Sequence, residues 1–255
     1  MKMLRTGVAG LVAILVASTA WATLTKEEAK RLNEATAVLS ELRGVPDNGI
    51  PDRIWEKARC VVVIPSVKKA AFIIGGEFGE GVMSCRRTNT WGAPVFMQLA
   101  KGSAGFQIGA SSTDLVLVVM NDRGVERLLH NKVTLGGDAS VAAGPVGRAA
   151  SAATDAQMTS EMLAYSRSKG IFAGIDLSGG TLKPDEDANQ RAYGPGINPS
   201  DVALGRQNVT IPPEAQAFVR ALNRENAATS GVSKPARPAA PSGTSHPKKP
   251  TGTYR

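Results

Sequence analysis

The sequence predicts a single α+β domain, in which a strongly curved, mainly antiparallel, glycine-rich sheet is flanked by helices. Short apolar runs divided by glycines dominate residues 60–135, as is typical of successive strands. Helical periodicity precedes these runs and returns near the end of the domain. Glycines at 75, 76, 79 and 81 interrupt the strand pattern, which indicates the bulges and bends of a curved sheet.

The first 22 residues have the composition of a cleaved export signal. Lys2 and Arg5 precede an apolar stretch over 7–17, and a small-x-small motif over 20–22 follows it. The apolar stretch is short for a membrane span, so we expect cleavage after Ala22 and a periplasmic or secreted protein. An uncleaved anchor is the alternative. No cysteine follows the apolar stretch, which excludes a bacterial lipoprotein anchor.

The net charge of +8 lies mostly outside the expected domain. Two bases belong to the leader and five to residues 226–255, where there are no acids, so residues 23–225 carry only about +1. The domain also lacks a cluster of aromatic and basic residues, so we expect no nucleic-acid binding. Residues 226–255 are rich in Pro, Ala and Ser, and we expect them to form a disordered basic tail.

Two helices are expected before the strands. Thr25 and Glu28 have the spacing of a capping box, and the apolar periodicity that follows ends at Gly44. A second, short helix is expected over 50–59, with Pro51 in its first turn.

Six apolar runs are expected to form strands, over 60–65, 69–76, 79–86, 93–100, 103–111 and 114–121. The last is apolar on both faces and is therefore expected in the centre of the sheet. A short helix should follow, with Asp122 as its cap. Four phenylalanines within these runs are expected in the core: Phe72, Phe78, Phe96 and Phe106.

The second half of the domain continues the pattern. Two strands are expected to meet at a turn formed by Lys169 and Gly170. Two short polar helices are expected over 184–192 and 199–205, and an amphipathic helix over 212–226 closes the fold.

The two cysteines, Cys60 and Cys85, are expected to form a disulfide. Two thiols in an exported chain most often pair, and both lie at the ends of predicted strands. A metal site is a poor alternative, because no histidine lies nearby. The bridge would bring the two strands side by side.

No motif for catalysis or for a cofactor is evident. The glycines of 75–81 are not followed by a helix, as a phosphate-binding loop requires. Ser66 and Lys69, like Ser166 and Lys169, fit a serine–lysine spacing, but the accompanying elements are absent. His130 is more typical of a helix end than of a catalytic base. We therefore expect a non-enzymatic protein without a cofactor.

The order of the segments resembles the SYLF domain family, also called Ysc84-like. The resemblance covers about residues 30–205 and rests on the ordered stretches "ARCVVVIPSVKKAAFIIGGEFGEGVMSCR", "WGAPVFMQLAKGSAGFQIGASSTDLVLVVMNDRGVERLL", "KVTLGGDASVAAGPVGR" and "AYSRSKGIFAGIDLSGGTL". It implies a lipid-binding domain, because eukaryotic relatives bind phosphoinositide-containing membranes and some bind actin filaments. From the export signal we expect a bacterial-type member of the family, and the signal argues against actin as its partner.

The resemblance leads us to expect an anionic lipid or membrane surface as the ligand. The candidate lipid contacts are the basic residues of three turns: Lys68, Lys69, Arg86, Arg87, Arg167 and Lys169. A disulfide between Cys60 and Cys85 would place the first two basic pairs in one region. The alternative reading is that these are ordinary solvated turn residues. The competing function is a structural envelope protein whose basic tail contacts polyanionic wall or outer-membrane components.

Overall fold

The computed structural model describes residues 24–42, 49–71, 74–88, 90–104, 109–129, 132–146, 159–168 and 171–230. The predicted leader and the predicted turn at Lys169 and Gly170 lie outside these residues, as do His130, Phe72 and Phe106. No helix within the described ranges is long and apolar enough to cross a membrane.

The described strands form a ten-stranded sheet in the order β6-β10-β4-β2-β1-β5-β8-β7, with β3 beside β2 and β9 beside β8. It is strongly curved, and its pairs are antiparallel except that between β7 and β8. The strands are β1 (Cys60–Ala71), β2 (Ile74–Arg87), β3 (Thr90–Trp91), β4 (Val95–Ala104), β5 (Gly109–Val119), β6 (Val133–Thr134), β7 (Val141–Ala143), β8 (Met162–Ser168), β9 (Ile171–Gly174) and β10 (Gly180–Pro184).

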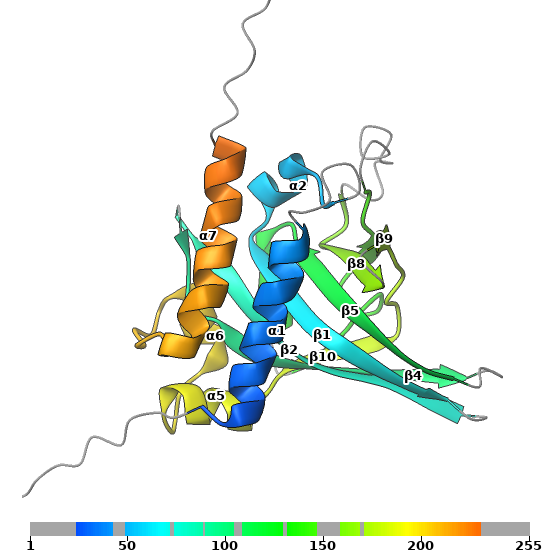
Figure 1. Cartoon of the computed structure of the whole chain (residues 1–255), viewed down its shortest axis with the longest axis horizontal. Helices are drawn as coiled ribbons and strands as arrows, with labels where there is room; N and C mark the ends of the chain where they lie inside the picture. The colour runs from blue at the N-terminus through cyan, green and yellow to red at the C-terminus, as the bar shows by residue number, and fades with distance from the viewer. Residues whose placement is uncertain are drawn as a thin grey trace, which may run out of the picture.

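Helices cover both faces of this sheet. They are α1 (Lys26–Leu42), α2 (Asp52–Lys57), α3 (Asp122–Leu129), α5 (Glu186–Tyr193), α6 (Pro199–Leu204) and α7 (Gln216–Ser230), with a 3-10 turn at Pro213–Ala215. Figure 1 shows α1 and α7 side by side across one face, while the outer ends of β1, β2, β4 and β5 extend beyond them. The predicted α+β class is confirmed.

Strand alternation divides the core into two apolar clusters. On the first face, α1, α2 and α7 pack against side chains such as Val61, Val63 and Phe96. On the second face, α3 and α6 pack against side chains such as Val62 and Ile64. The central place expected for the strand over 114–121 is confirmed, because β5 pairs with both β1 and β8.

The predicted strand boundaries differ from the observed ones at two hairpins. Stretches 69–76 and 103–111 were expected to be separate strands, yet β1 ends at Ala71 and β2 begins at Ile74, and β4 ends at Ala104 and β5 begins at Gly109. The chain therefore reverses within both stretches. Their Phe- and Ile-rich composition is typical of strands, and periodicity alone does not reveal a reversal inside such a run.

The predicted capping residues are confirmed for α1, whereas the cap of α3 lies one residue before the predicted one. Thr25 and Glu28 form the expected capping box, with the Thr25 N–H donating to the Glu28 carboxylate at 2.7 Å. The first turn of α3 is capped by Asn121, whose side chain accepts from Gly124 N–H at 2.9 Å, and not by Asp122. At the other end of the chain, α7 continues to Ser230, past the expected start of the tail at 226.

Candidate interaction surfaces

The disulfide lies at one end of the β1–β2 hairpin. Cys60 and Cys85 pair directly across the two strands, with 4.0 Å between their Cα atoms, so the predicted bridge is confirmed. Lys68 pairs with Phe78 near the other end of the hairpin. Arg86 lies eight residues farther along β2 than Phe78, so about 26 Å of strand separate these two residues. The bridge therefore does not bring the two predicted basic pairs into one region.

Arg86 and Arg87 point to opposite faces of β2 and are held by other parts of the domain. The Arg86 guanidinium stacks over the Trp91 ring at 4.9 Å and donates to the Trp55 carbonyl at 2.7 Å. Burial and the nearby Arg59 lower the pKa of Arg86. Arg87 donates to the Val202 carbonyl in α6 at 2.5 Å.

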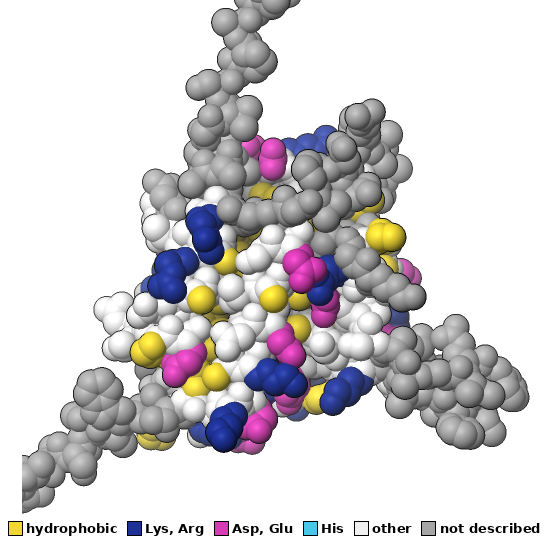
Figure 2. Space-filling view, viewed as in Figure 1, with side chains coloured by type: hydrophobic (Ala, Val, Ile, Leu, Met, Phe, Trp, Pro, Cys, Tyr) yellow, Lys and Arg dark blue, Asp and Glu magenta, His cyan; other side chains and the backbone are white. Residues whose placement is uncertain are grey.

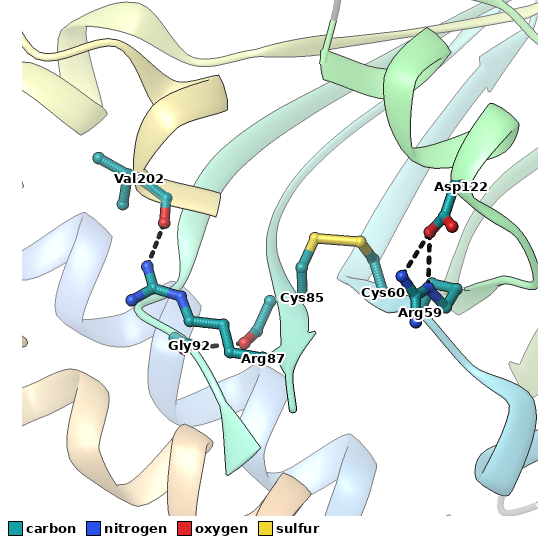
Figure 3. The surroundings of a disulfide bond; sticks show 8 residues. Arg59, Cys60, Cys85, Arg87, Gly92, Asp122 and Val202 are labelled. Carbon is teal, nitrogen blue, oxygen red and sulfur yellow. Dashed lines mark hydrogen bonds and ion pairs between the residues drawn. A yellow bond between two sulfur atoms is a disulfide. The ribbon is translucent and has the colours of Figure 1, made fainter. Parts of the chain in front are cut away.

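A cleft of about 320 Å³ lies beside the disulfide. Figure 3 shows Arg87 reaching toward Val202 on one side of the bridge and Arg59 toward Asp122 of α3 on the other. The Arg59 guanidinium is 2.5 Å from the Asp122 carboxylate. An anion entering this cleft would compete with groups that already pair with the arginines.

Arg167 is likewise engaged within the protein. Its guanidinium is 2.6 Å from the Asp114 carboxylate of β5 and also contacts Glu41 of α1. Burial lowers its pKa. Among the other predicted contacts, Lys68 is exposed, Lys69 lies in β1 opposite Glu77, and Lys169 lies outside the described residues. A lipid-contact role for the six residues stays a prediction.

A groove of about 450 Å³ separates α1 from the β1–β2 hairpin. Phe78, expected in the core, is 49% exposed on its wall, whereas Phe96 is buried as expected. Phe78 and Lys68 lie directly opposite each other on neighbouring strands, so their side chains share a face. The charged lining is mixed: Glu27, Lys30, Arg31, Glu34, Lys68 and Glu80. Figure 2 shows acids and bases interspersed on this side of the molecule. The groove thus joins an exposed aromatic ring to charges of both signs.

A bulge in β1 shapes this groove. The pairing shifts by one residue between Val63 and Lys68, and Ser66 has a positive φ of 52°. The Ser66 N–H donates to the Asp114 carboxylate at 2.8 Å, which satisfies a backbone donor that leaves the ladder. Glycines of β2 face the bulge: a Cβ on Gly81 would lie 2.2 Å from the Val63 carbonyl oxygen. Of the four glycines predicted to mark bulges or bends, Gly79 and Gly81 thus lie opposite a bulge, whose extra residue belongs to β1, whereas Gly75 and Gly76 pair regularly with β1.

The floor of the groove contains a buried cation that sequence reasoning missed. Arg31 is only 7% exposed and contacts the carboxylates of Asp185 at 2.9 Å and Glu80 at 2.7 Å. Its guanidinium also lies 5.4 Å from the centre of the Phe96 ring. Asp185 is 154 residues away in sequence, and no local pattern connects the two residues.

The described part of the chain contains no group of three or more His, Cys, Asp or Glu residues that could hold a metal ion.

Residues 100–225 match a family model described as "Ysc84: Las17-binding protein actin regulator". The chain is 36% identical over 180 residues to protein YSC84 of Saccharomyces cerevisiae, which covers 69% of this chain and 38% of the relative. It is 34% identical over 200 residues to SH3 domain-containing YSC84-like protein 1 of Rattus norvegicus, and this match covers 78% of this chain and 57% of the relative. LAS seventeen-binding protein 3 of Saccharomyces cerevisiae is 33% identical over 180 residues, covering 69% and 39%.

The chain carries a Ysc84-family domain. It spans between 38% and 57% of the length of these relatives. The family is described as a binding protein and regulator, and the resemblance to SYLF domains is confirmed. The expectation that actin is a poor partner is wrong, because the family description and the name of LAS seventeen-binding protein 3 connect the Ysc84 domain with actin regulation and Las17 binding.

Proposed function

We propose that this chain is a non-enzymatic binding protein whose Ysc84 domain recognises a protein of the actin-regulating kind, either actin or a Las17-type protein. The family match over 100–225 is the observation that carries the proposal. The groove beside α1 is the surface we assign to this contact. An exposed aromatic ring within a rim of mixed charge is typical of the centre of a protein interface.

Co-sedimentation with filamentous actin and a binding titration with purified Las17 test this proposal. We expect the full chain to bind one of them and Phe78→Ala to weaken binding about tenfold or more, because a central aromatic contact contributes over about 1.4 kcal/mol. Ile171→Ala is the matched control, since Ile171 is 66% exposed but lies outside the groove. Binding to neither protein overturns the proposal, and equal losses in the two variants overturn the groove assignment.

A second candidate function is binding to anionic membranes. It is favoured by one observation: Phe78 and Lys68, both exposed, lie on the same face of the hairpin. An aromatic ring and a lysine suit the interface of an anionic bilayer, where each basic residue contributes about 1 kcal/mol.

Vesicle co-sedimentation at low and high salt distinguishes the sources of such binding. Recognition by the hairpin predicts salt-sensitive binding to anionic liposomes that is weaker in the Lys68→Ser variant. The control is Arg220→Ser on the exposed face of α7, which should bind as strongly as the wild type. Binding that disappears when 231–255 are deleted instead supports the tail as the contact with polyanionic envelope components. No binding to any vesicle contradicts the membrane proposal.

We also propose that residues 1–22 direct the chain to an oxidising compartment, the periplasm or the exterior. The disulfide between Cys60 and Cys85 suits such a compartment, because disulfides persist there and are rare in the cytosol. The intact mass and N-terminal sequence of the protein from its native cells test this. Cleavage after Ala22 is the expected result, and an intact N-terminus in the cytosolic fraction overturns it. Cleavage would also contradict actin as the partner in the cell, because an exported chain does not meet cytosolic actin.

A further inference from the structure

The outer half of β5 has a strand on one side only. The whole of β5, Gly109–Val119, pairs with β1, but its pairing with β8 covers only Asp114–Val119. Within the described ranges, no strand therefore pairs with Gly109–Thr113 on the side away from β1. Figure 1 shows that this end of β5 extends past the helices. Such an edge presents N–H and C=O groups that can accept another strand.

The hydrogen bonds of β5 show which residues present these groups. Met120 donates its N–H to the Glu161 carbonyl at 2.8 Å, on the β8 side of the strand. In an antiparallel ladder, successive residues direct their backbone groups alternately to the two neighbours. The extra residue of the bulge belongs to β1, so the alternation along β5 is uninterrupted. Ala110 and Ser112 consequently direct their N–H and C=O groups to the open side.

We propose that two copies of this chain pair through Gly109–Thr113 of β5, antiparallel and centred on Ser111. In that register Ala110 of one copy lies opposite Ser112 of the other, so each outward donor meets an outward acceptor. The segment is self-complementary by symmetry, as a two-fold interface requires. A continuous sheet would then run from β1 and β5 of one copy into β5 and β1 of the second.

The residue types of this edge favour a second copy. The segment reads Gly-Ala-Ser-Ser-Thr and contains none of the charges or prolines with which natural edge strands usually resist pairing. The segment consists of small residue types, and it adds no charge to the contact.

Electrostatics sets the salt dependence of the pairing. Lys68 and Lys69 of β1 lie beside Ser112 and Ser111, one strand inside the edge. In the paired state three strand spacings, about 14 Å, separate the lysines of the two copies. This exceeds the Debye length of about 8 Å at physiological ionic strength, so their repulsion is screened there and grows at low salt. The dimer is therefore expected to strengthen as salt is added.

Cysteine cross-linking tests the register directly. In Ser111→Cys the two introduced thiols face each other at a Cα separation of about 4.5 Å, within the reach of a disulfide. In Ser112→Cys the two positions are offset by two residues and lie about 8 Å apart, beyond that reach. Under mild oxidation of the full chain we expect at least about tenfold faster disulfide-linked dimer formation for Ser111→Cys. Equal rates, or no dimer in either variant, overturn the proposal.

Sedimentation equilibrium across protein concentrations provides the second test. Ser112→Pro removes an outward N–H without removing a bond to β1, and it should abolish self-association, whereas Ser112→Ala should retain it. A wild-type chain that stays monomeric at every concentration and salt level also overturns the inference. So does a dimer that Ser112→Pro leaves unchanged, because a different surface then forms the contact.

Discussion

The Arg31 guanidinium donates to the Asp185 carboxylate at 2.9 Å, and both side chains are buried. This contact connects the first helix of the domain to the start of α5, where Asp185 also accepts the Ala188 N–H at 3.2 Å. One carboxylate thus serves as a helix cap and as the partner of a buried cation, so α1 and α5 depend on each other.

Arg31→Ala is expected to lower the free energy of unfolding by about 3–5 kcal/mol, because it leaves the Asp185 carboxylate buried without its cation. Lys30→Ala is the control, since its ion pair with Glu34 lies at the surface, and it should change stability by less than about 0.5 kcal/mol. Urea denaturation measures both. Similar midpoints for the two variants would show that the buried contact contributes little.

Gly81→Ala is expected to destabilise the domain by about 1–3 kcal/mol, because its Cβ would meet the β1 backbone at the bulge. Gly102→Ala in β4 is the matched control. A Cβ there meets no atom within 4 Å, so its effect should be near zero or slightly stabilising. Thermal melting of the two proteins compares these outcomes, and an unperturbed Gly81→Ala melt would contradict the close approach.

Replacing both cysteines by alanine is expected to lower the free energy of unfolding by about 3 kcal/mol, since the bridge closes a loop across a sequence separation of 25. Wild-type protein unfolded in urea with a reductant should have the same free energy of unfolding as the double variant. A double variant as stable as the oxidised wild type would show that the bridge adds nothing to the pairing of β1 with β2.

Hydrogen bonds from the Ser178 side chain and N–H lower the pKa of Asp176 below its ordinary value of 3.8. When the pKa of a carboxylate is lower in the folded than in the unfolded protein, its ionisation stabilises the fold at every pH above the unfolded-state pKa. This stabilisation disappears as the pH falls through the folded-state pKa. The stabilising effect is therefore lost below about pH 3.8.

Ser178→Ala is expected to raise the pKa of Asp176 toward 3.8. Carbonyl carbon NMR titration measures it. Asp138 is an internal control, because its lowered pKa arises first from the Thr134 N–H, at 2.7 Å. An unchanged Asp176 titration would contradict this cause.

Patterns within a few residues of each other were enough to predict several features. The capping box at Thr25 and Glu28 needs only one helical turn. The disulfide follows from having just two cysteines at the ends of strands, and the glycines of β2 indicate a bulge because a close backbone approach excludes a Cβ.

Features set by distant segments could not be predicted in this way. The exposure of Phe78 depends on where α1 stops covering the sheet, and strand composition says nothing about that limit. The separation of Lys68 from Arg86 depends on which end of the hairpin holds the disulfide. The burial of Arg31 depends on α5, whose start is 154 residues away from it in the sequence.

The bulge in β1 absorbs one extra residue without changing which side of the outer sheet each side chain faces. Val63 and Lys68 lie on the side of α1, whereas Ile64 and Val67 lie on the opposite side, so two residues of the bulge take the place of one in the alternation. Deleting one residue at the bulge would restore a regular ladder, in which Lys68 stays opposite Phe78 and on the side of α1. The outer sheet can thus vary in length by one residue during evolution while the groove keeps the side chains that line it.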